Sequence, residues 1–317
     1  MLGFALCRMA QVGLTIGVLA GVVFLALRAA PGGPAYVLLG PDRYTPALAA
    51  RINQQLGLDR PLPEQFVRWL DQMAHGELGY SYFHHRPAIA VVLERLPATL
   101  QLGGLAFLLS LAVGVPVGVW AAVRRESWVD HLLSSSAVAV LSMPSFWLGV
   151  GLILVCSAWL HLLPSAGLAP IGQEGDLPER ARHLVLPVLT MAASHAASLA
   201  LYTRAAMVEA LLADYTRTAR MMGESERTVI WRRALATAAV SIATIAGLTM
   251  AHLVEGSIVV ETVFAWPGIG QLTVASLPRR DYPVLLVITL FVGLVVVLAN
   301  SLADLAYRWL DPRMVDK

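Results

Sequence analysis

Long apolar segments, separated by polar ones, constrain the fold of this chain most. Six such stretches recur along the 317 residues, each near or above the length of about 18 residues that marks a helix able to cross a bilayer. Only 14% of the residues are charged, whereas soluble domains carry roughly 25%. The sequence therefore predicts an all-α membrane protein with six transmembrane helices, at residues 9–29, 97–122, 131–159, 184–207, 236–262 and 283–306.

Prolines and glycines divide the chain between these helices. Pro31-Gly32-Gly33-Pro34 ends the first helix, and residues 30–96 then predict an extracytoplasmic lobe with two short helices, Thr45 to Leu56 and Pro61 to Ala74. We expect Pro97 in the first turn of the second span, where proline is tolerated, and we expect Met143-Pro144-Ser145 to interrupt the third. The expected parts are a first transmembrane helix (1–29), the lobe (30–96), a five-helix core (97–306) and a cytoplasmic tail (307–317).

Residues 209–234 form a polar, Arg-rich island between the fourth and fifth spans. Helix-favouring residues run up to Gly223, and Ser225 can cap a second helix that begins near Glu226. We therefore expect a helix, a glycine turn and a second helix at a membrane surface. The island carries no set of catalytic side chains, which favours a docking surface. The simpler alternative is a positively charged anchor without a partner.

The distribution of basic residues predicts the orientation. With both termini inside, the inner segments hold twelve Lys and Arg side chains and the two short outer loops hold four. Such an excess marks the cytoplasmic side. Cleavage of the first helix after Ala30 would leave the new N-terminus outside, so we expect that helix to stay uncleaved.

Motifs for nucleotide binding and catalysis are absent from the sequence. It contains no G-x-x-x-x-G-K-[ST], H-E-x-x-H or G-x-S-x-G. Cys7 and Cys156 are too far apart in sequence to suggest a disulfide framework or a metal site, and the net charge of +2 gives no support for nucleic-acid binding. The adjacent pair His84-His85 is either solvated or a metal contact.

Several short motifs follow one another along nearly the whole chain. LGLDRPLPEQFVRWL occupies residues 56–70, the island follows, and ETVFAWPGIG, Arg280-Asp281-Tyr282-Pro283 and LDPR occupy 261–270, 280–283 and 310–313. Together they resemble the permease subunits of ABC importers for dipeptides, oligopeptides and nickel. The island resembles the EAA coupling loop of that family, through Glu209, Ala210, Asp214, Tyr215, Arg217, Arg220, Gly223 and Glu226.

The resemblance implies a type I ABC importer permease fold in the bacterial cytoplasmic membrane, with both termini in the cytoplasm. It implies a translocation pore without catalysis or a cofactor of its own. The implied partners are a second homologous permease, two cytoplasmic ATPase subunits that bind ATP and Mg²⁺, an extracytoplasmic solute-binding protein and the lipid bilayer. The implied solutes are di- or oligopeptides; nickel or a metal chelate is the alternative.

The chain departs from the family pattern where the island joins the fifth span. The family places an Asn and then a Pro there, whereas this chain has Ala236-Thr237-Ala238-Ala239-Val240. We therefore expect a straighter join between the coupling loop and the fifth helix.

Glu255 and His252 are the sharpest candidates inside a span. They lie three residues apart and so share a helical face, and an acid at the middle of a span costs about 2.5–3.5 kcal/mol on insertion. Either they line the translocation path and favour a cationic solute, or they form a buried hydrogen bond or face the partner permease.

The outer segment 263–282 contains Phe264, Trp266, Pro267 and Gly268. Pro267 and Gly268 predict a tight turn, and the two aromatic side chains are expected as anchors at the membrane interface. The resemblance implies a scoop-like loop at the pore mouth; a plain interfacial loop is the alternative.

Two other classes of protein fit less well. A secondary transporter would require internal repeats and intramembrane ion sites, and an intramembrane enzyme would require a paired nucleophile and base. Ser194 and His195 are neighbours in sequence and therefore project to different faces of a helix.

Overall fold

The computed structural model describes the backbone of residues 2–29, 39, 44–55, 57–170, 172 and 175–310. Side chains are described in the same ranges, except at 2–11, 27–28, 251–256, 299–300 and 302–310. Within these ranges the regular structure is helical, and one isolated bridge joins Tyr80 to Pro87. The chain divides into two compact units, Met1–Pro97 with Gly268–Val297, and Ala98–Pro267 with Leu298–Lys317.

The first unit holds the N-terminal helix, the outer lobe and two later segments. Its helices are α1 (Leu2–Ala29), α3 (Pro46–Gln55), α4 (Leu62–Ala74), the start of α5 (Ala88–Val123), α12 (Ile269–Arg279) and α13 (Tyr282–Leu310) up to Val297. The two predicted lobe helices are confirmed as α3 and α4. The hydroxyl of Thr45 accepts a hydrogen bond from the N–H of Leu48 at 3.3 Å, as expected of a capping residue.

Aromatic and aliphatic side chains hold the first unit together. The apolar face of α4 meets α1 through Phe66 and Trp69, whose rings lie 5.2 and 5.5 Å from that of Phe24. Trp69 also packs against a core that joins α5, α12 and α13, in which Val91 and Val284 are buried.

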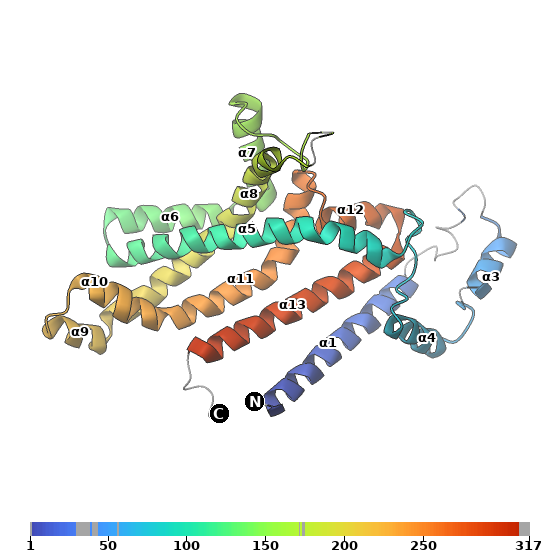
Figure 1. The fold of residues 1–317 in the computed structure, drawn as a ribbon, viewed down its shortest axis with the longest axis horizontal. Helices are drawn as coiled ribbons and strands as arrows, with labels where there is room; N and C mark the ends of the chain where they lie inside the picture. The colour runs from blue at the N-terminus through green and yellow to red at the C-terminus, as the bar shows by residue number, and fades with distance from the viewer. Residues whose placement is uncertain are drawn as a thin grey trace. The chain divides into compact units, whose positions relative to one another are not determined.

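The second unit is built around α8 (Leu177–Leu212), which packs against α6 (Trp128–Ser142), α7 (Ser145–Leu152) and α11 (Leu235–Val263) (Figure 1). A π-helix, η1 (Ile153–Trp159), continues α7. The remainder of α5 also lies on α8. A Cβ at Gly118 would stand 2.5 Å from the carbonyl oxygen of Ala200, so only glycine permits this approach.

The six predicted spans correspond to α1, α5, the α6–α7–η1 segment, α8, α11 and α13. Among the described residues, three helices are long and apolar enough to cross a membrane, Ala88–Val123, Leu177–Leu212 and Glu226–Met250, and the bent pair Trp128–Ser142 and Ser145–Trp159 gives a fourth if it is counted as one span. The residues searched in α1 and α13 give shorter apolar stretches, Val12–Ala26 and Tyr282–Leu298. Pro144 breaks the third predicted span as expected, and the two helices beside it are bent by 101°.

Two predicted helix starts are wrong. α5 begins at Ala88, so Pro97 lies inside the helix and not in its first turn, and α8 begins at Leu177, before the predicted start at residue 184. In α8 a polar stretch, Pro178 to His183, precedes the apolar part. In α5 the charged pair Glu94-Arg95 separates the apolar beginning of the helix from the longer apolar part that follows Pro97, so the hydropathy pattern alone places both starts too late. The predicted division into four parts is not tested by the two units and stays a prediction.

Candidate functional site

The island contains one helix break in addition to the glycine turn that the sequence predicted. α8 ends at Leu212, Ala213 is extended, and a separate helix, α9 (Asp214–Met221), follows. The last carbonyl groups of a helix have no partner within it. Here the buried hydroxyl of Thr216 donates a hydrogen bond to the carbonyl oxygen of Ala213 at 2.6 Å and lies 3.0 Å from that of Leu211. This local capping stabilises the break.

The glycine turn is confirmed at Gly223. Its φ is +81°, a backbone conformation that costs other residues energy. The N–H of Glu224 donates to the carbonyl oxygen of Ala219 at 3.1 Å, and that of Gly223 to Arg220 at 3.0 Å. This pair of hydrogen bonds is the Schellman motif, which terminates α9.

The second helix of the island begins where the sequence predicted. The hydroxyl of Ser225 accepts the N–H of Thr228 at 3.3 Å and so caps α10 (Glu226–Thr228). A π-helix, η2 (Val229–Ala234), connects α10 to α11, and residues 226–250 count as one helix. The island therefore continues into α11 without a break, in agreement with the straight join expected from the missing proline.

Two ion pairs at the surface of the island connect residues near its glycine turn to the helices that follow it. Arg220 Nε lies 2.8 Å from Glu226 Oε1, and the guanidinium of Arg233 lies 2.5 Å from Glu224 Oε1. The hydrogen bond from Arg233 lowers the pKa of Glu224 from its ordinary value of 4.5. Because Arg220 pairs within the chain, Arg217 is the better candidate of the two for pairing with an acidic partner.

The side chains of the island separate into an inner and an outer set. Thr216, Ala219, Val229 and Ala234 are buried, together with Ala210 of α8. The predicted residues Glu209, Asp214, Tyr215, Arg217, Arg220 and Glu226 are exposed. Exposed apolar side chains accompany them, and of these the sequence motif had included only Tyr215. We call this set the apolar knuckle: Leu212, Tyr215, Met221, Met222 and Trp231.

A buried carboxylate supports the helices that carry the island. Asp130 is 1% exposed, and Arg204 of α8 binds it through two nitrogens at 2.5 and 2.6 Å. The N–H of Glu126 and the hydroxyl of Ser134 also donate to Asp130. Arg204, a basic residue just before the island, thus joins α6 to α8. No sequence pattern near Arg204 indicates this partner, which lies 74 positions earlier.

The expected interfacial role of Phe264 and Trp266 is wrong. The two side chains are 1% and 0% exposed and belong to the core of the second unit. Trp266 Nε1 donates to the carbonyl oxygen of Ala98 at 2.9 Å, so its polar group is satisfied inside the protein. The turn occurs at Ala265, with φ of +47°, and Gly268 instead precedes α12. The scoop-like role of Phe264, Trp266, Pro267 and Gly268 stays a prediction.

Two further buried acidic side chains were not predicted as site residues from the sequence. In the second unit, Glu261 is completely buried and accepts the hydroxyl of Thr99 at 2.7 Å. In the first unit, Asp281 is 1% exposed and accepts the Ser81 hydroxyl at 2.5 Å and the N–H of Tyr82 at 3.0 Å. Asp281 thereby fixes the segment before α5 to the start of α13.

The candidates within the fifth span lie on α11, but the side chains of His252 and Glu255 are outside the described residues. Their proposed role therefore stays a prediction. Among the described residues, no group of three or more His, Cys, Asp or Glu side chains is placed to hold a metal ion.

Comparison with protein families decides the class. Residues 114–316 match the binding-protein-dependent transport system inner membrane component, and residues 1–103 match the N-terminal part of such membrane components. The chain belongs to this permease family. Its recognition from the sequence motifs is therefore confirmed.

Curated members of the permease family match over nearly their whole length. The chain is 38% identical to the "Probable D,D-dipeptide transport system permease protein DdpB" of Escherichia coli (strain K12), with 92% of each chain covered. It is 35% identical to the oligopeptide transport system permease protein AppB of Bacillus subtilis (strain 168), covering 95% of this chain and 96% of the relative.

Solved structures show that the fold is that of an importer permease. An inward-facing structure of the MetNI methionine ABC transporter matches with a TM-score of 0.57 at 21% identity, covering 71% of this chain and 98% of the other. An amino acid ABC transporter matches with a TM-score of 0.52 at 17% identity, covering 70% and 94%. The predicted helical membrane fold is confirmed.

Proposed function

We propose that this chain is a translocation subunit of an ATP-driven importer that takes up di- or oligopeptides delivered by a solute-binding protein. The names of relatives that match over nearly their whole length support the peptide class. In this proposal ATP and Mg²⁺ are bound by two separate ATPase subunits, and a second, similar permease completes the pore.

The observation that carries the proposal is the construction of the island. Hydrogen bonds at both ends of α9 and two ion pairs hold it in one shape, while the apolar knuckle remains exposed. A fixed, partly apolar projection suits docking into a groove, because little conformational freedom is lost on binding. We assign the ATPase contact to Tyr215, Met221 and Met222, with Arg217 as the charged contributor.

The island is connected to the spans at both ends. It follows α8 directly and continues through η2 into α11, and α8 and α11 pack against each other (Figure 1). A displacement of the docked island would therefore move two packed helices together. Rocking of such a unit against a similar partner would open the path alternately to each side.

The test is uptake by the assembled complex in proteoliposomes, with a radiolabelled dipeptide and a nickel chelate supplied in parallel. We expect ATP-dependent, binding-protein-dependent uptake of the dipeptide. Uptake of the chelate alone would mean that the chain serves metal import and not peptide import. Uptake without ATP would contradict the proposal as a whole.

A further inference from the structure

A cavity of about 500 Å³ lies within the first unit. Its walls come from α1, α4, the segment 76–89 and the start of α13. Ligand pockets in proteins typically measure about 300–1,000 Å³ and combine apolar walls with a few polar groups. The volume is therefore sufficient for a whole small ligand.

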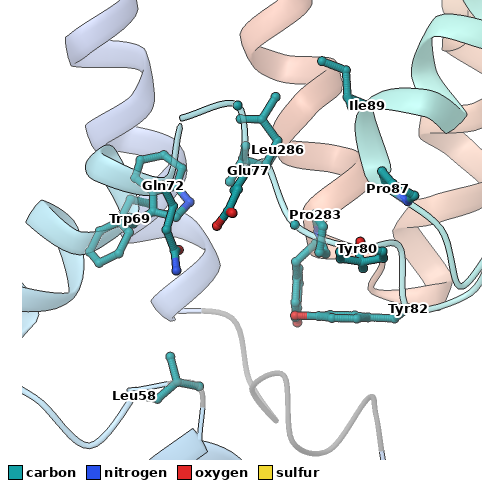
Figure 2. A pocket seen from close by; sticks show the side chains of 15 residues that line it. Leu58, Trp69, Gln72, Glu77, Tyr80, Tyr82, Pro87, Ile89, Pro283 and Leu286 are labelled. Atoms are coloured by element: carbon teal, nitrogen blue, oxygen red, sulfur yellow. The ribbon is translucent and has the colours of Figure 1, made fainter. Parts of the chain in front are cut away.

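The lining combines several aromatic side chains with aliphatic residues and one carboxylate. Trp69, Tyr80, Tyr82 and Tyr282 contribute rings, and Glu77 contributes the acid. Figure 2 shows the carboxylate of Glu77 and the amide of Gln72 directed into the space between Trp69 on one side and Tyr82 and Pro283 on the other.

Both walls are fixed without the help of a ligand. On one side, Trp69 stacks in the cluster with Phe66 and Phe24. On the other, Asp281 holds the backbone of Tyr82. The cavity is therefore preorganised, which lowers the cost of binding.

The carboxylate of Glu77 lines the cavity but takes no part in these contacts. Its side chain makes no hydrogen bond or ion pair within the described part of the chain. A carboxylate beside several aromatic faces suits an ammonium group, which pairs with the acid and is attracted to the rings. A chelated metal ion would instead require several oxygen or nitrogen ligands converging at one point.

We propose that this cavity binds the amino-terminal ammonium group and first side chain of a small peptide. Glu77 receives the ammonium group, Gln72 hydrogen-bonds the first peptide unit, and the aromatic rings enclose the side chain. The site would hold solute on the outer lobe, separately from any site in the spans. This inference rests on the proposed function for its choice of peptide.

The test measures binding apart from transport. The assembled complex, without solute-binding protein, is placed in phosphatidylglycerol nanodiscs, whose lipid carries no ammonium group that could compete for the site. Equilibrium binding of radiolabelled Ala-Phe is compared with that of N-acetyl-Ala-Phe. We expect saturable binding of the free dipeptide, about tenfold weaker for the acetylated form and for Glu77→Gln, since a charged hydrogen bond is lost in both.

The control is Glu64→Gln, which removes an exposed carboxylate of the same lobe that does not line the cavity. It should bind like the wild type. Tyr80→Ala, a change at a side chain that is 67% exposed and so tolerated by the fold, should weaken binding. Equal binding of both peptides, or an unchanged affinity in Glu77→Gln, overturns the proposal.

Two further outcomes have separate meanings. One shows whether the bound ammonium group comes from a peptide or a lipid, and the other tests the proposed import of peptides. If added phosphatidylethanolamine abolishes dipeptide binding, the site belongs to a lipid headgroup and the peptide assignment is overturned. If the dipeptide binds through Glu77 but is not taken up with the solute-binding protein present, the cavity stands and the proposed import of peptides fails.

Discussion

The island and the outer-lobe segment 79–88 are both fixed by carboxylates, but in opposite settings. Asp281 holds the outer segment from a buried position, through hydrogen bonds to Ser81 and Tyr82. In the island, Glu224 and Glu226 hold arginines at the surface. A buried acid is costly to unpair, whereas an exposed pair contributes little. Backbone hydrogen bonds, more than ion pairs, should therefore define the shape of the island.

The largest effect is expected where a buried acid loses its cation. Arg204→Met leaves Asp130 buried without its main partner, which should lower the free energy of unfolding by about 3–5 kcal/mol. Thermal unfolding of the purified complex measures the change. The double variant Asp130→Asn/Arg204→Met should recover part of the loss; no recovery would contradict the pairing.

Removing the carboxylate of Asp281, which holds the outer segment, should have the next largest effect on stability. Asp281→Ala leaves the Ser81 hydroxyl and the Tyr82 N–H without their acceptor, at a cost of about 2–3 kcal/mol. Limited proteolysis should then cleave within residues 79–88, and Asp281→Asn, which keeps one acceptor oxygen, should be cleaved more slowly. Wild-type resistance in Asp281→Ala would show that the anchor lies elsewhere.

Gly223 tests the backbone of the island. Gly223→Ala forces a side chain into a φ of +81° and should cost about 1 kcal/mol. We expect a greater loss of dipeptide uptake than of ATP hydrolysis, because α9 shifts relative to α10. Gly167→Ala carries a similar strain at φ +86° outside the island, and equal losses of uptake in both variants would contradict the special role of Gly223.

The exposed pair should matter least to stability. Glu226→Gln removes the partner of Arg220, but both side chains are well exposed, so the melting temperature should not change measurably. A clear drop in melting temperature would mean that surface charges, and not backbone hydrogen bonds, hold the island.

The Glu224–Arg233 pair should make the thermal stability of the protein depend slightly on pH. The pKa of Glu224 is lowered in the folded chain, so its contribution is present above its unfolded value of 4.5 and is lost as pH falls through the folded value. Melting of the wild type should therefore decline slightly more than that of Glu224→Gln below about pH 4.5. Parallel profiles would exclude the contribution.

Local chemistry explains what the sequence predicted well. The apolar runs, the break at Pro144, the glycine turn at Gly223 and the Ser225 cap depend on a few neighbouring residues. The starts of α5 and α8 were missed because charged residues, Glu94-Arg95 in α5 and the first turns of α8, interrupt the apolar pattern inside a continuous helix.

Long-range pairing explains what the sequence could not predict. Asp281 and Ser81 are 200 positions apart, and Trp266 meets Ala98 from 168 positions away. Nothing near Trp266 distinguishes a membrane-interface anchor from a core residue until its partner helix is known. The cavity around Glu77 likewise requires four separate segments.

Cross-linking tests the central claim, that the island docks on an ATPase subunit, most directly. Met221→Cys, made in a chain with Cys7→Ser and Cys156→Ser, is treated with a short photoactivated thiol reagent in the assembled complex. The account predicts a covalent adduct with an ATPase subunit, and none from Tyr80→Cys in the outer lobe. An adduct with the solute-binding protein, or none at all in a complex that still transports, would contradict it.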